Sequence, residues 1–321
     1  MTGKPVLWIT RKLSANTEAR AARDYDVILN PDDRVFSRDE IVEMSSRVDA
    51  ILPCHSEIFD AETVARLDPR VKIIANHSVG VDHCDLDALK SRGIVVTNTP
   101  DVLSKATAEI ALLLMLAAAR RAGEGVRLVR AGQWDSWSPS FMVGTQMTDK
   151  RLGIVGMGRV GQAFAKLVEG FDMEIHYYNR RRLPPEQERG AIYHETVEEL
   201  LPHCDFVSLH CPATPETENL MNAERLALLP DGAILVNTAR GKLVEEDALI
   251  AALKSGKLAA AGLDVFKTEP GGNPAFAELD NIFMLPHIGS ATRETRDAMG
   301  FRALDNLDAF FAGQEPRDRV A

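Results

Sequence analysis

The chain has no apolar segment long enough to cross a membrane. Its longest uninterrupted apolar run, Ile110 to Ala119, is ten residues. Because a spanning helix needs about 20 such residues, we expect this run to form a buried helix instead. The apolar run within Met1–Thr10 is also too short for a secretory signal peptide. These two absences favour a cytoplasmic protein that does not enter the membrane.

Positive charge and cysteine are also scarce. The 37 Lys and Arg residues are outnumbered by 47 Asp and Glu residues, and the formal net charge is −10. This balance argues against a nucleic-acid partner or an anionic membrane surface. The four cysteines, which have no spacing typical of a metal site, are expected to be reduced thiols, and no metal ion is expected. They are Cys54, Cys84, Cys204 and Cys211.

Short β-rich runs alternate with helical intervals over the first hundred residues. This alternation predicts a parallel sheet with crossover helices. The helical intervals include Ser37–Arg47 and Asp60–Leu67. The expected strands are Val6–Ile9, Asp26–Leu29, Ala50–Leu52, Lys72–Ala75 and Ile94–Thr97.

A long apolar helix is predicted next, over roughly Ser104–Arg121, with Ser104 as its N-cap. Five apolar residues fall on one predicted face of this helix. They are Ala106, Ile110, Leu113, Leu114 and Ala117.

A second strand–helix series follows from Lys150, and Thr292–Ala312 is predicted as a terminal amphipathic helix. Two such series predict an α/β protein of two doubly wound parallel-sheet, Rossmann-like domains, with the active site in the interdomain cleft. The expected strands of the second series are Leu152–Val155, Glu174–Tyr178, Phe206–Leu209, Ala233–Val236, Ala260–Leu263 and Ile282–Leu285.

A glycine-rich loop, Gly156-Met-Gly-Arg-Val-Gly161, follows the first strand of this second series and opens a predicted helix. In a dinucleotide-binding loop, Gly156 allows a tight turn, Gly158 lets the backbone approach a pyrophosphate, and Gly161 permits close helix–strand packing. The helix N-terminus then offers N–H groups to the phosphates. The motif alone is weak evidence, and a structural turn is the alternative, but the strand–loop–helix context favours a dinucleotide.

The end of the next strand predicts which dinucleotide binds. Asn179 stands where an acidic residue would bind the ribose 2′-hydroxyl of NAD, and Arg180 and Arg181 follow it. An asparagine does not repel a 2′-phosphate, and an arginine can bind that phosphate with several donors. A solvated basic turn is the alternative. We therefore predict that NADPH is preferred over NADH.

Arg240, Glu269 and His287 each follow a predicted strand of the second series. Alone, they could be a surface arginine, a turn residue and a buried histidine. Together they can bind an anionic substrate, tune a histidine and move a proton near neutral pH. Ligand sites of open α/β sheets gather at such strand ends. We therefore predict that the three residues form a catalytic group.

The motifs around these residues resemble the D-isomer-specific 2-hydroxyacid dehydrogenase family, and within it the glyoxylate/hydroxypyruvate reductases. The resemblance covers nearly the whole chain, with several long motifs in the right order. The matching stretches are Gly80–His83, Asn98–Asp101, Gly156–Gly161, Asn237–Gly241, Ala261–Phe266 and Pro286–Thr292.

The resemblance implies roles for residues throughout the chain. Arg240 would bind the carboxylate and carbonyl oxygen of a 2-keto acid, Glu269 would pair with the acid/base His287, and Trp137 would reach the partner's active site in a homodimer. The other implied substrate-binding residues are Leu52, Val79, Gly80 and Ser290, with the loop Leu52–His55 flanking the substrate. The other implied cofactor-binding residues are Thr107, Arg159, Val160, Cys211, Pro212, Thr217, Thr238, Ala239 and Asp264, besides His287.

The resemblance also implies a discontinuous substrate-binding domain, residues 1–100 with 289–321, and a dinucleotide-binding domain, residues 101–288. The implied activity is NADPH-dependent reduction of glyoxylate and hydroxypyruvate. Two alternatives stay open: reduction of bulkier 2-keto acids such as 2-ketogluconate, and a redox-sensing, corepressor-like protein that binds NAD(P). The formate dehydrogenases of the family carry glutamine where Glu269 stands, which argues against that branch.

Overall fold

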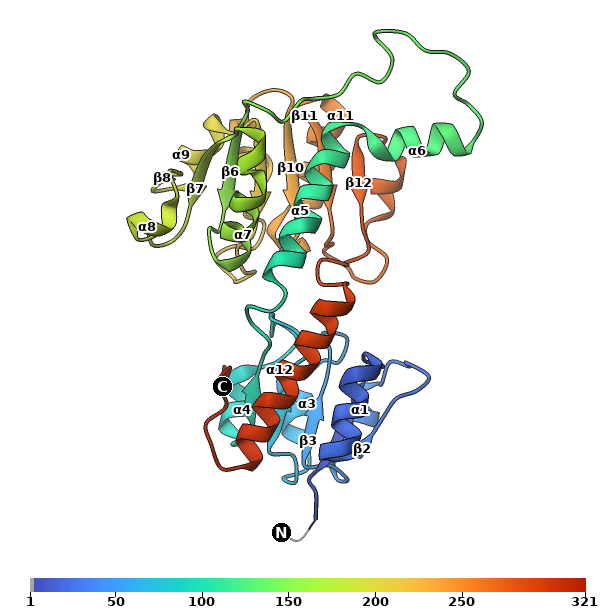
Figure 1. Ribbon diagram of the computed structural model, residues 1–321, viewed down its shortest axis with the longest axis vertical. Helices are drawn as coiled ribbons and strands as arrows, with labels where there is room; N and C mark the ends of the chain where they lie inside the picture. Colours follow the sequence, from blue (N-terminus) through green and yellow to red (C-terminus); the bar gives the residue numbers. More distant parts are fainter. Residues whose placement is uncertain (1–2) are drawn as a thin grey trace. The chain divides into compact units, whose positions relative to one another are not determined.

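The computed structural model describes residues 3–321, which divide into two compact units (Figure 1). The first unit is Met1–Leu103 with Ser290–Ala321, and the second is Ser104–Gly289. The chain therefore leaves the first unit once and returns to it for its last helix. The assignment of the units to substrate and dinucleotide binding stays a prediction.

The first unit is built on a five-stranded parallel sheet of order β2-β1-β3-β4-β5. Its strands are β1 (Val6–Ile9), β2 (Asp26–Ile28), β3 (Ala50–Leu52), β4 (Ile73–Ala75) and β5 (Val95–Thr97). Its helices are α1 (Ala15–Asp24), α2 (Arg38–Ser45), α3 (Ala61–Arg66), α4 (Leu86–Ser91) and α12 (Arg293–Phe311).

Alternate residues of these strands enter two separate cores, as the two-residue period of a strand requires. Trp8 packs with residues of α2, α3 and α4, whereas its neighbours Leu7 and Ile9 pack with residues of α1 and α12. Both faces of the sheet are thus covered by helices, which is the usual state of a parallel sheet.

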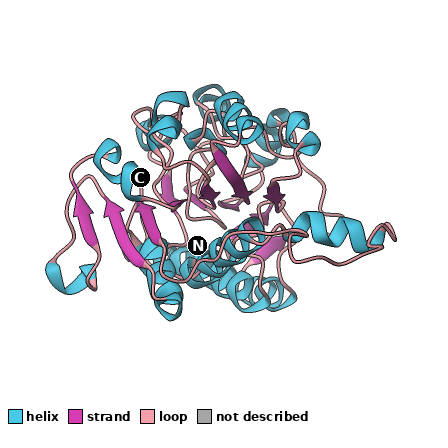
Figure 2. Ribbon diagram, turned by 90° about the horizontal axis from the view of Figure 1, so that it is seen from above, coloured by secondary structure: helices cyan, strands magenta, loops and turns pink. Residues whose placement is uncertain are grey.

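The second unit is built on a seven-stranded parallel sheet of order β12-β11-β10-β9-β6-β7-β8, with helices on both faces (Figure 2). Its strands are β6 (Arg151–Val155), β7 (Glu174–Tyr178), β8 (Ile192–His194), β9 (Phe206–Leu209), β10 (Ala233–Asn237), β11 (Leu258–Leu263) and β12 (Ile282–Met284). Its α-helices are α5 (Ser104–Ala119), α6 (Ala122–Arg130), α7 (Arg159–Val168), α8 (Pro185–Glu188), α9 (Val197–Leu200), α10 (Ala223–Leu228) and α11 (Glu246–Ser255).

The structure confirms the predicted fold of two parallel-sheet α/β units and corrects two details of the apolar helix. Ser104 is the first residue of α5 rather than its N-cap. On the predicted face, Ala106, Leu114 and Ala117 are buried, whereas Leu113 is 45% exposed. Because nearly every residue of this helix is apolar, its sequence does not show which side of the helix packs against the rest of the unit. No helix within residues 3–321 is long and apolar enough to span a membrane.

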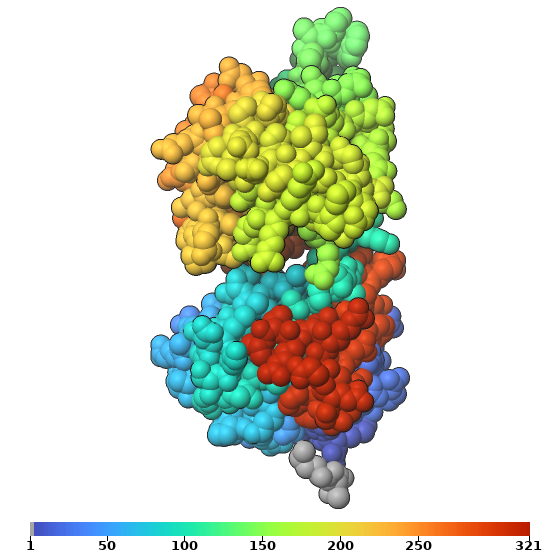
Figure 3. Space-filling view, turned by 90° about the vertical axis from the view of Figure 1, so that its left-hand side faces the viewer, coloured from blue at the N-terminus to red at the C-terminus, as the bar shows by residue number. Residues whose placement is uncertain are grey.

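Helix α6 and the loop after it form an arm, residues 122–146, that extends from the body of the second unit (Figures 1 and 3). None of the residues of α6 is buried. The arm carries several large apolar side chains that are more than 40% exposed: Val126, Val129, Trp134, Trp137, Phe141 and Val143.

Candidate active site

Three neighbouring strands of the second unit end in the loops that carry the predicted catalytic residues. Arg240 lies after β10, Glu269 after β11 and His287 after β12, and these strands are consecutive in the sheet. Because parallel strands end at the same edge of a sheet, the three loops lie next to one another.

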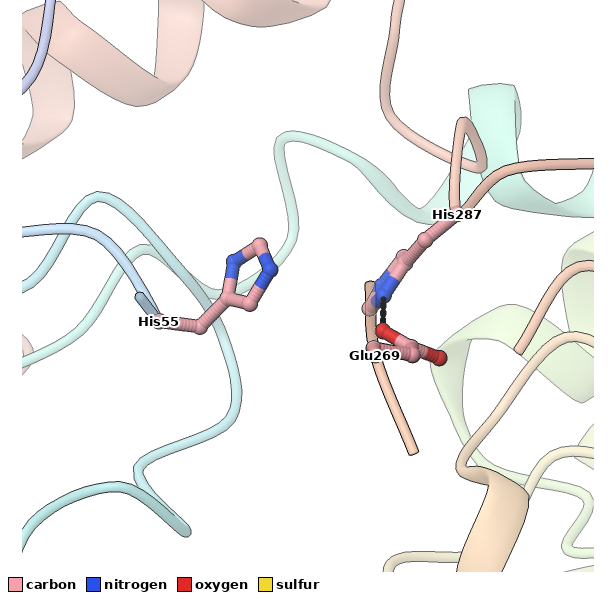
Figure 4. A group of neighbouring side chains, drawn as sticks. All are labelled: His55, Glu269 and His287. Carbon is pink, nitrogen blue, oxygen red and sulfur yellow. Dashed lines mark hydrogen bonds and ion pairs between the residues drawn. The ribbon is translucent and has the colours of Figure 1, made fainter. Parts of the chain in front are cut away.

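Glu269 and His287 form a hydrogen-bonded pair (Figure 4). His287 Nδ1 lies 2.6 Å from Glu269 Oε2, and the other carboxylate oxygen accepts the N–H of Phe266 at 2.7 Å. An ionised carboxylate accepts from Nδ1–H, which leaves Nε2 as the ring nitrogen that can exchange a proton. The side chains are 32% and 24% exposed, so this proton can reach solvent or a ligand.

Asp264 holds the backbone of the loop that carries His287. Its buried carboxylate accepts the N–H groups of Ile288 at 2.8 Å and Gly289 at 2.7 Å. Burial raises the pKa of Asp264, and these two N–H groups and His287 oppose that shift. His287 itself has a left-handed backbone, with φ of 52°. The side chain of Asp264 faces inward and binds this loop, and its predicted contact with the cofactor stays a prediction.

The Arg240 loop is held by a buried asparagine and by a close backbone approach. Asn237 accepts the N–H of Ala239 at 3.0 Å and donates to the carbonyl of Arg240 at 2.8 Å. A Cβ at Gly241 would overlap the backbone of Phe266 and Lys267, which belong to the Glu269 loop. Only glycine therefore allows the Arg240 and Glu269 loops to pack this closely.

The glycine loop has the geometry that a dinucleotide pyrophosphate requires. Gly156 has φ of 98°, and a Cβ there would overlap the backbone of Cys211. At Gly161 a Cβ would overlap the carbonyl of Gly156, whereas the space beside Gly158 at the N-terminus of α7 is open. A side chain at Gly158 would occupy this open space, where phosphates bind at a helix N-terminus. The loop thus fits a dinucleotide.

Asn179 ties the end of β7 to this loop, because its Oδ1 accepts the N–H of Met157 at 2.7 Å. The three arginines that follow are exposed but differ in their contacts. Arg182 pairs with Glu188 at 2.7 Å, and no such pair is found for Arg180 or Arg181 within residues 3–321. Burial raises the pKa of the Cys211 thiol to about 11, and the charge of Arg180 opposes this shift. Arg180 therefore lies near the loop after β9.

The other predicted cofactor contacts lie in three regions of the second unit. Arg159 and Val160 begin α7, and Thr107 is buried in the first turns of α5. The remaining residues lie in the loops after β9 and β10: Cys211, Pro212, Thr217, Thr238 and Ala239. These loops end beside the glycine loop, because β9 pairs with both β6 and β10. The individual contacts with a cofactor stay predictions.

Val79 and Gly80 lie in a loop of the first unit whose carbonyl groups are already bonded. Asn98 Nδ2 donates to the carbonyl of Val79, and Ser78 Oγ donates to that of Gly80, both at 2.8 Å. Among the described residues, no acceptor is found for the N–H group of Val79 or Gly80. Both residues are accessible to solvent, so these two donors can meet an anion.

The structure does not support a side-chain contact between Leu52 and a substrate. Leu52 ends β3 and is fully buried in the core of the first unit. The resemblance implied that Leu52 binds substrate, because the loop Leu52–His55 would flank it, but the side chain of Leu52 points into the core. Ser290 is partly exposed. Trp137 is 75% exposed on the arm.

A family model described as "D-isomer specific 2-hydroxyacid dehydrogenase, NAD binding domain" matches residues 112–289. The chain is 44% identical to the glycerate dehydrogenase of Hyphomicrobium methylovorum, over 98% of both chains. It is also 44% identical to the glyoxylate reductase of Pyrococcus furiosus, over 98% of this chain and 94% of that protein.

A solved structure extends the likeness to the fold. The NADPH-dependent glyoxylate/hydroxypyruvate reductase of Sinorhizobium meliloti, in complex with NADP and malonate, is 31% identical. It has a TM-score of 0.87, over 99% of this chain and 97% of that one. With a matched NAD-binding domain and full-length relatives of these names, the chain belongs to the D-isomer-specific 2-hydroxyacid dehydrogenase family, in its glyoxylate/hydroxypyruvate reductase branch.

Proposed function

We propose that this enzyme reduces small 2-keto acids, glyoxylate and hydroxypyruvate, to glycolate and D-glycerate with NADPH. The relatives named glyoxylate reductase and glycerate dehydrogenase support this substrate class. The observation that carries the proposal is the bonded pair of Glu269 and His287, on a loop packed against the loop of Arg240. The proposal gives His287 the role of proton donor and Arg240 the role of anion-binding group, and it is supported by the position of their loops at one edge of the sheet that carries the glycine loop.

The proposed chemistry uses the three residues in separate roles. The bound reduced nicotinamide supplies the hydride for the keto carbon. His287 Nε2 gives a proton to the carbonyl oxygen as negative charge grows there, and Glu269 stabilises the protonated ring. Arg240 donates to the substrate carboxylate and carbonyl oxygen through its planar guanidinium. The reverse oxidation requires the neutral histidine, which accepts the proton of the hydroxyl group.

The substrate carboxylate has a second proposed set of donors in the first unit. The N–H groups of Val79 and Gly80 would bind it, and Ser290 would lie close to the substrate. The N–H groups of Val79 and Gly80 share peptide groups with the carbonyls of Ser78 and Val79. Both carbonyls accept hydrogen bonds, from Thr99 N–H at 2.9 Å and from Asn98 Nδ2 at 2.8 Å, and this supports the proposal because it orients the two peptide groups without using their N–H donors. The side chain of Leu52 is left out of this set.

NADP(H) preference is proposed on the basis of Asn179, Arg180 and Arg181. The asparagine carries no charge against a 2′-phosphate, and its side chain fixes the strand end to the glycine loop. The two arginines are exposed, and neither is engaged in an ion pair within residues 3–321. The NADP-bound relative from Sinorhizobium meliloti supports this cofactor.

We also propose a homodimer in which the arm binds the partner and Trp137 reaches the partner's active site. The exposed apolar side chains of the arm support this, because water contact with such a surface is unfavourable. Light scattering should give twice the chain mass, and Trp137→Ala should change the relative rates with different 2-keto acids. A monomer with an unaltered substrate profile would contradict the assignment. A cytoplasmic location remains a prediction from the sequence.

Initial rates test the activity directly. Glyoxylate, hydroxypyruvate, pyruvate and 2-ketogluconate are each supplied with NADPH or NADH, and loss of reduced cofactor is followed. We expect the highest kcat/KM with NADPH and either glyoxylate or hydroxypyruvate. A clear preference for 2-ketogluconate would replace the proposed substrate with a bulkier one. Cofactor binding without turnover of any of these acids would favour the corepressor-like alternative.

A further inference from the structure

Three histidines gather at the outer edge of the seven-stranded sheet. His176 lies on β7, His194 on the edge strand β8, and His203 ends a short 3-10 helix, Leu201–His203. The yellow-green surface that faces the reader in Figure 3 belongs to this edge of the second unit. None of the three histidines belongs to the loops that carry the proposed catalytic residues.

The spacing of the three rings is that of imidazoles around one metal ion. The ring centroids are 5.2, 5.4 and 5.3 Å apart, which makes a nearly equilateral triangle. Zinc–nitrogen bonds of about 2.0–2.1 Å in tetrahedral geometry place imidazole centroids about 5 Å apart. The nitrogens do not converge in this arrangement, because His176 Nδ1 and His194 Nε2 are hydrogen-bonded to each other at 2.9 Å and the His203 ring stacks on that of His176. The side chains must therefore rotate before one nitrogen of each meets a shared ion.

A carboxylate already orients the most buried of these rings. His176 Nε2 lies 2.8 Å from Glu174 Oε1, and His176 Nδ1 lies 2.9 Å from His194 Nε2. Donation to the carboxylate places the proton on Nε2, so the lone pair of Nδ1 is directed toward His194. Carboxylates hold metal-binding histidines in this way, with the second nitrogen left for the ion.

The three rings differ in their exposure to solvent. His176 is buried, His194 is half-buried and His203 is exposed, so an ion can enter from the side of His203.

We propose that His176, His194 and His203 bind a first-row divalent transition ion, with Zn²⁺ as the representative, and that Glu174 positions His176. Imidazole suits Zn²⁺ and its neighbours in the series, whereas Mg²⁺ and Ca²⁺ require oxygen ligands. The ion would tie the edge strand β8 and the 3-10 helix to β7. The expected absence of a metal site rested on cysteine spacing, and that criterion cannot detect ligands from three separate elements.

Calorimetric titration with Zn²⁺ alone tests the site on chelator-treated full-length protein. We expect one ion per chain and a higher Tm with Zn²⁺ than without it. The double variant His194→Gln/His203→Gln should lose at least a hundredfold in affinity and most of the Tm increase. Glu174→Gln, which leaves all three ligands in place, should weaken binding by about 10- to 100-fold.

Two controls separate this site from others. His287→Ala removes a histidine of the proposed catalytic group and should bind Zn²⁺ as the wild type does. His203→Gln changes one exposed residue, so it tests the site even where the double variant fails to fold, and it should lose at least tenfold. The proposal is overturned if the wild type binds no Zn²⁺, if His203→Gln binds it with unchanged affinity, or if His287→Ala abolishes binding.

Discussion

The two units have the same architecture, but their strand-end loops carry different chemistry. Both are parallel sheets with helices on each face. In the first unit the loop at Val79 and Gly80 presents backbone N–H groups, whereas the loops of the second unit present Arg240, Glu269 and His287. The fold supplies the place for a site, and the loop residues determine what each site does.

A buried carboxylate stabilises a strand-end loop in each unit. In the first, Glu57 accepts Thr10 Oγ1 at 2.5 Å and the N–H of Cys54 at 3.0 Å. In the second, Asp264 accepts backbone N–H groups of the loop that carries His287, whose backbone is left-handed. Both units thus use a buried carboxylate to hold a loop, and in the second unit that loop carries His287, the proposed proton donor. The comparison predicts that chemistry and ligand binding can be altered separately.

The largest effect is expected for His287→Ala, which should remove proton transfer and leave dinucleotide binding intact. Loss of a general acid costs about 10²- to 10⁴-fold in turnover. We therefore expect kcat to fall by that range, while the Kd for NADPH from fluorescence titration stays within about twofold. Weaker NADPH binding in step with the loss of turnover would show that His287 supports the fold of the site instead.

Arg180→Ala should change cofactor choice without changing the chemistry. A charge-assisted hydrogen bond contributes about 1.5–3 kcal/mol, so the KM for NADPH should rise about tenfold or more. The KM for NADH should stay nearly constant. Arg182→Ala is the matched control, because Arg182 is already paired with Glu188. Equal effects of the two variants on NADPH would argue against a selective role for Arg180.

Glu269→Gln should slow the chemistry and leave dinucleotide binding intact. The amide can still accept from the Nδ1–H group of His287, but it lacks the negative charge that would stabilise a protonated ring. The kcat for reduction should therefore fall, by less than the loss expected for His287→Ala, while the Kd for NADPH stays nearly constant. Steady-state rates and fluorescence titration measure the two effects, and an unchanged kcat would leave Glu269 with a structural role.

The smallest effect is expected in the first unit, for Asn98→Ala. This change removes the hydrogen bond to the carbonyl of Val79. One such bond contributes about 1 kcal/mol, so the KM for the 2-keto acid should rise roughly fivefold. The KM for NADPH should not change. A larger rise in the KM for NADPH than in the KM for the 2-keto acid would contradict the proposed division of roles between the two units.

Most of the fold could be predicted from the sequence because its strands are short, apolar and regularly spaced. All eleven expected strands are present, from Val6–Ile9 to Ile282–Met284. The edge strand β8 was missed, since its sequence Ile-Tyr-His is short and mixed in polarity. The exposure of Leu113 was missed because an apolar sequence does not show which face of a helix is covered.

For the site, motif order indicated the residues but not which way each side chain points. The resemblance to the family implied that Glu269 pairs with His287, and the structure adds the atoms that meet, His287 Nδ1 and Glu269 Oε2 at 2.6 Å. Asp264 and Leu52 lie in or beside site motifs, yet both side chains face the interior. Burial of this kind depends on contacts between distant segments. The histidine cluster at β7 and β8 was missed for the same reason.

Gly241 has a consequence for the engineering of this enzyme. Because its backbone lies against Phe266 and Lys267, the Arg240 and Glu269 loops share one boundary. An insertion or a bulkier residue in either loop would push on the other. Libraries that aim at new substrates should therefore vary the two loops together and keep position 241 fixed. A library that varies the exposed surface of the arm carries no such constraint.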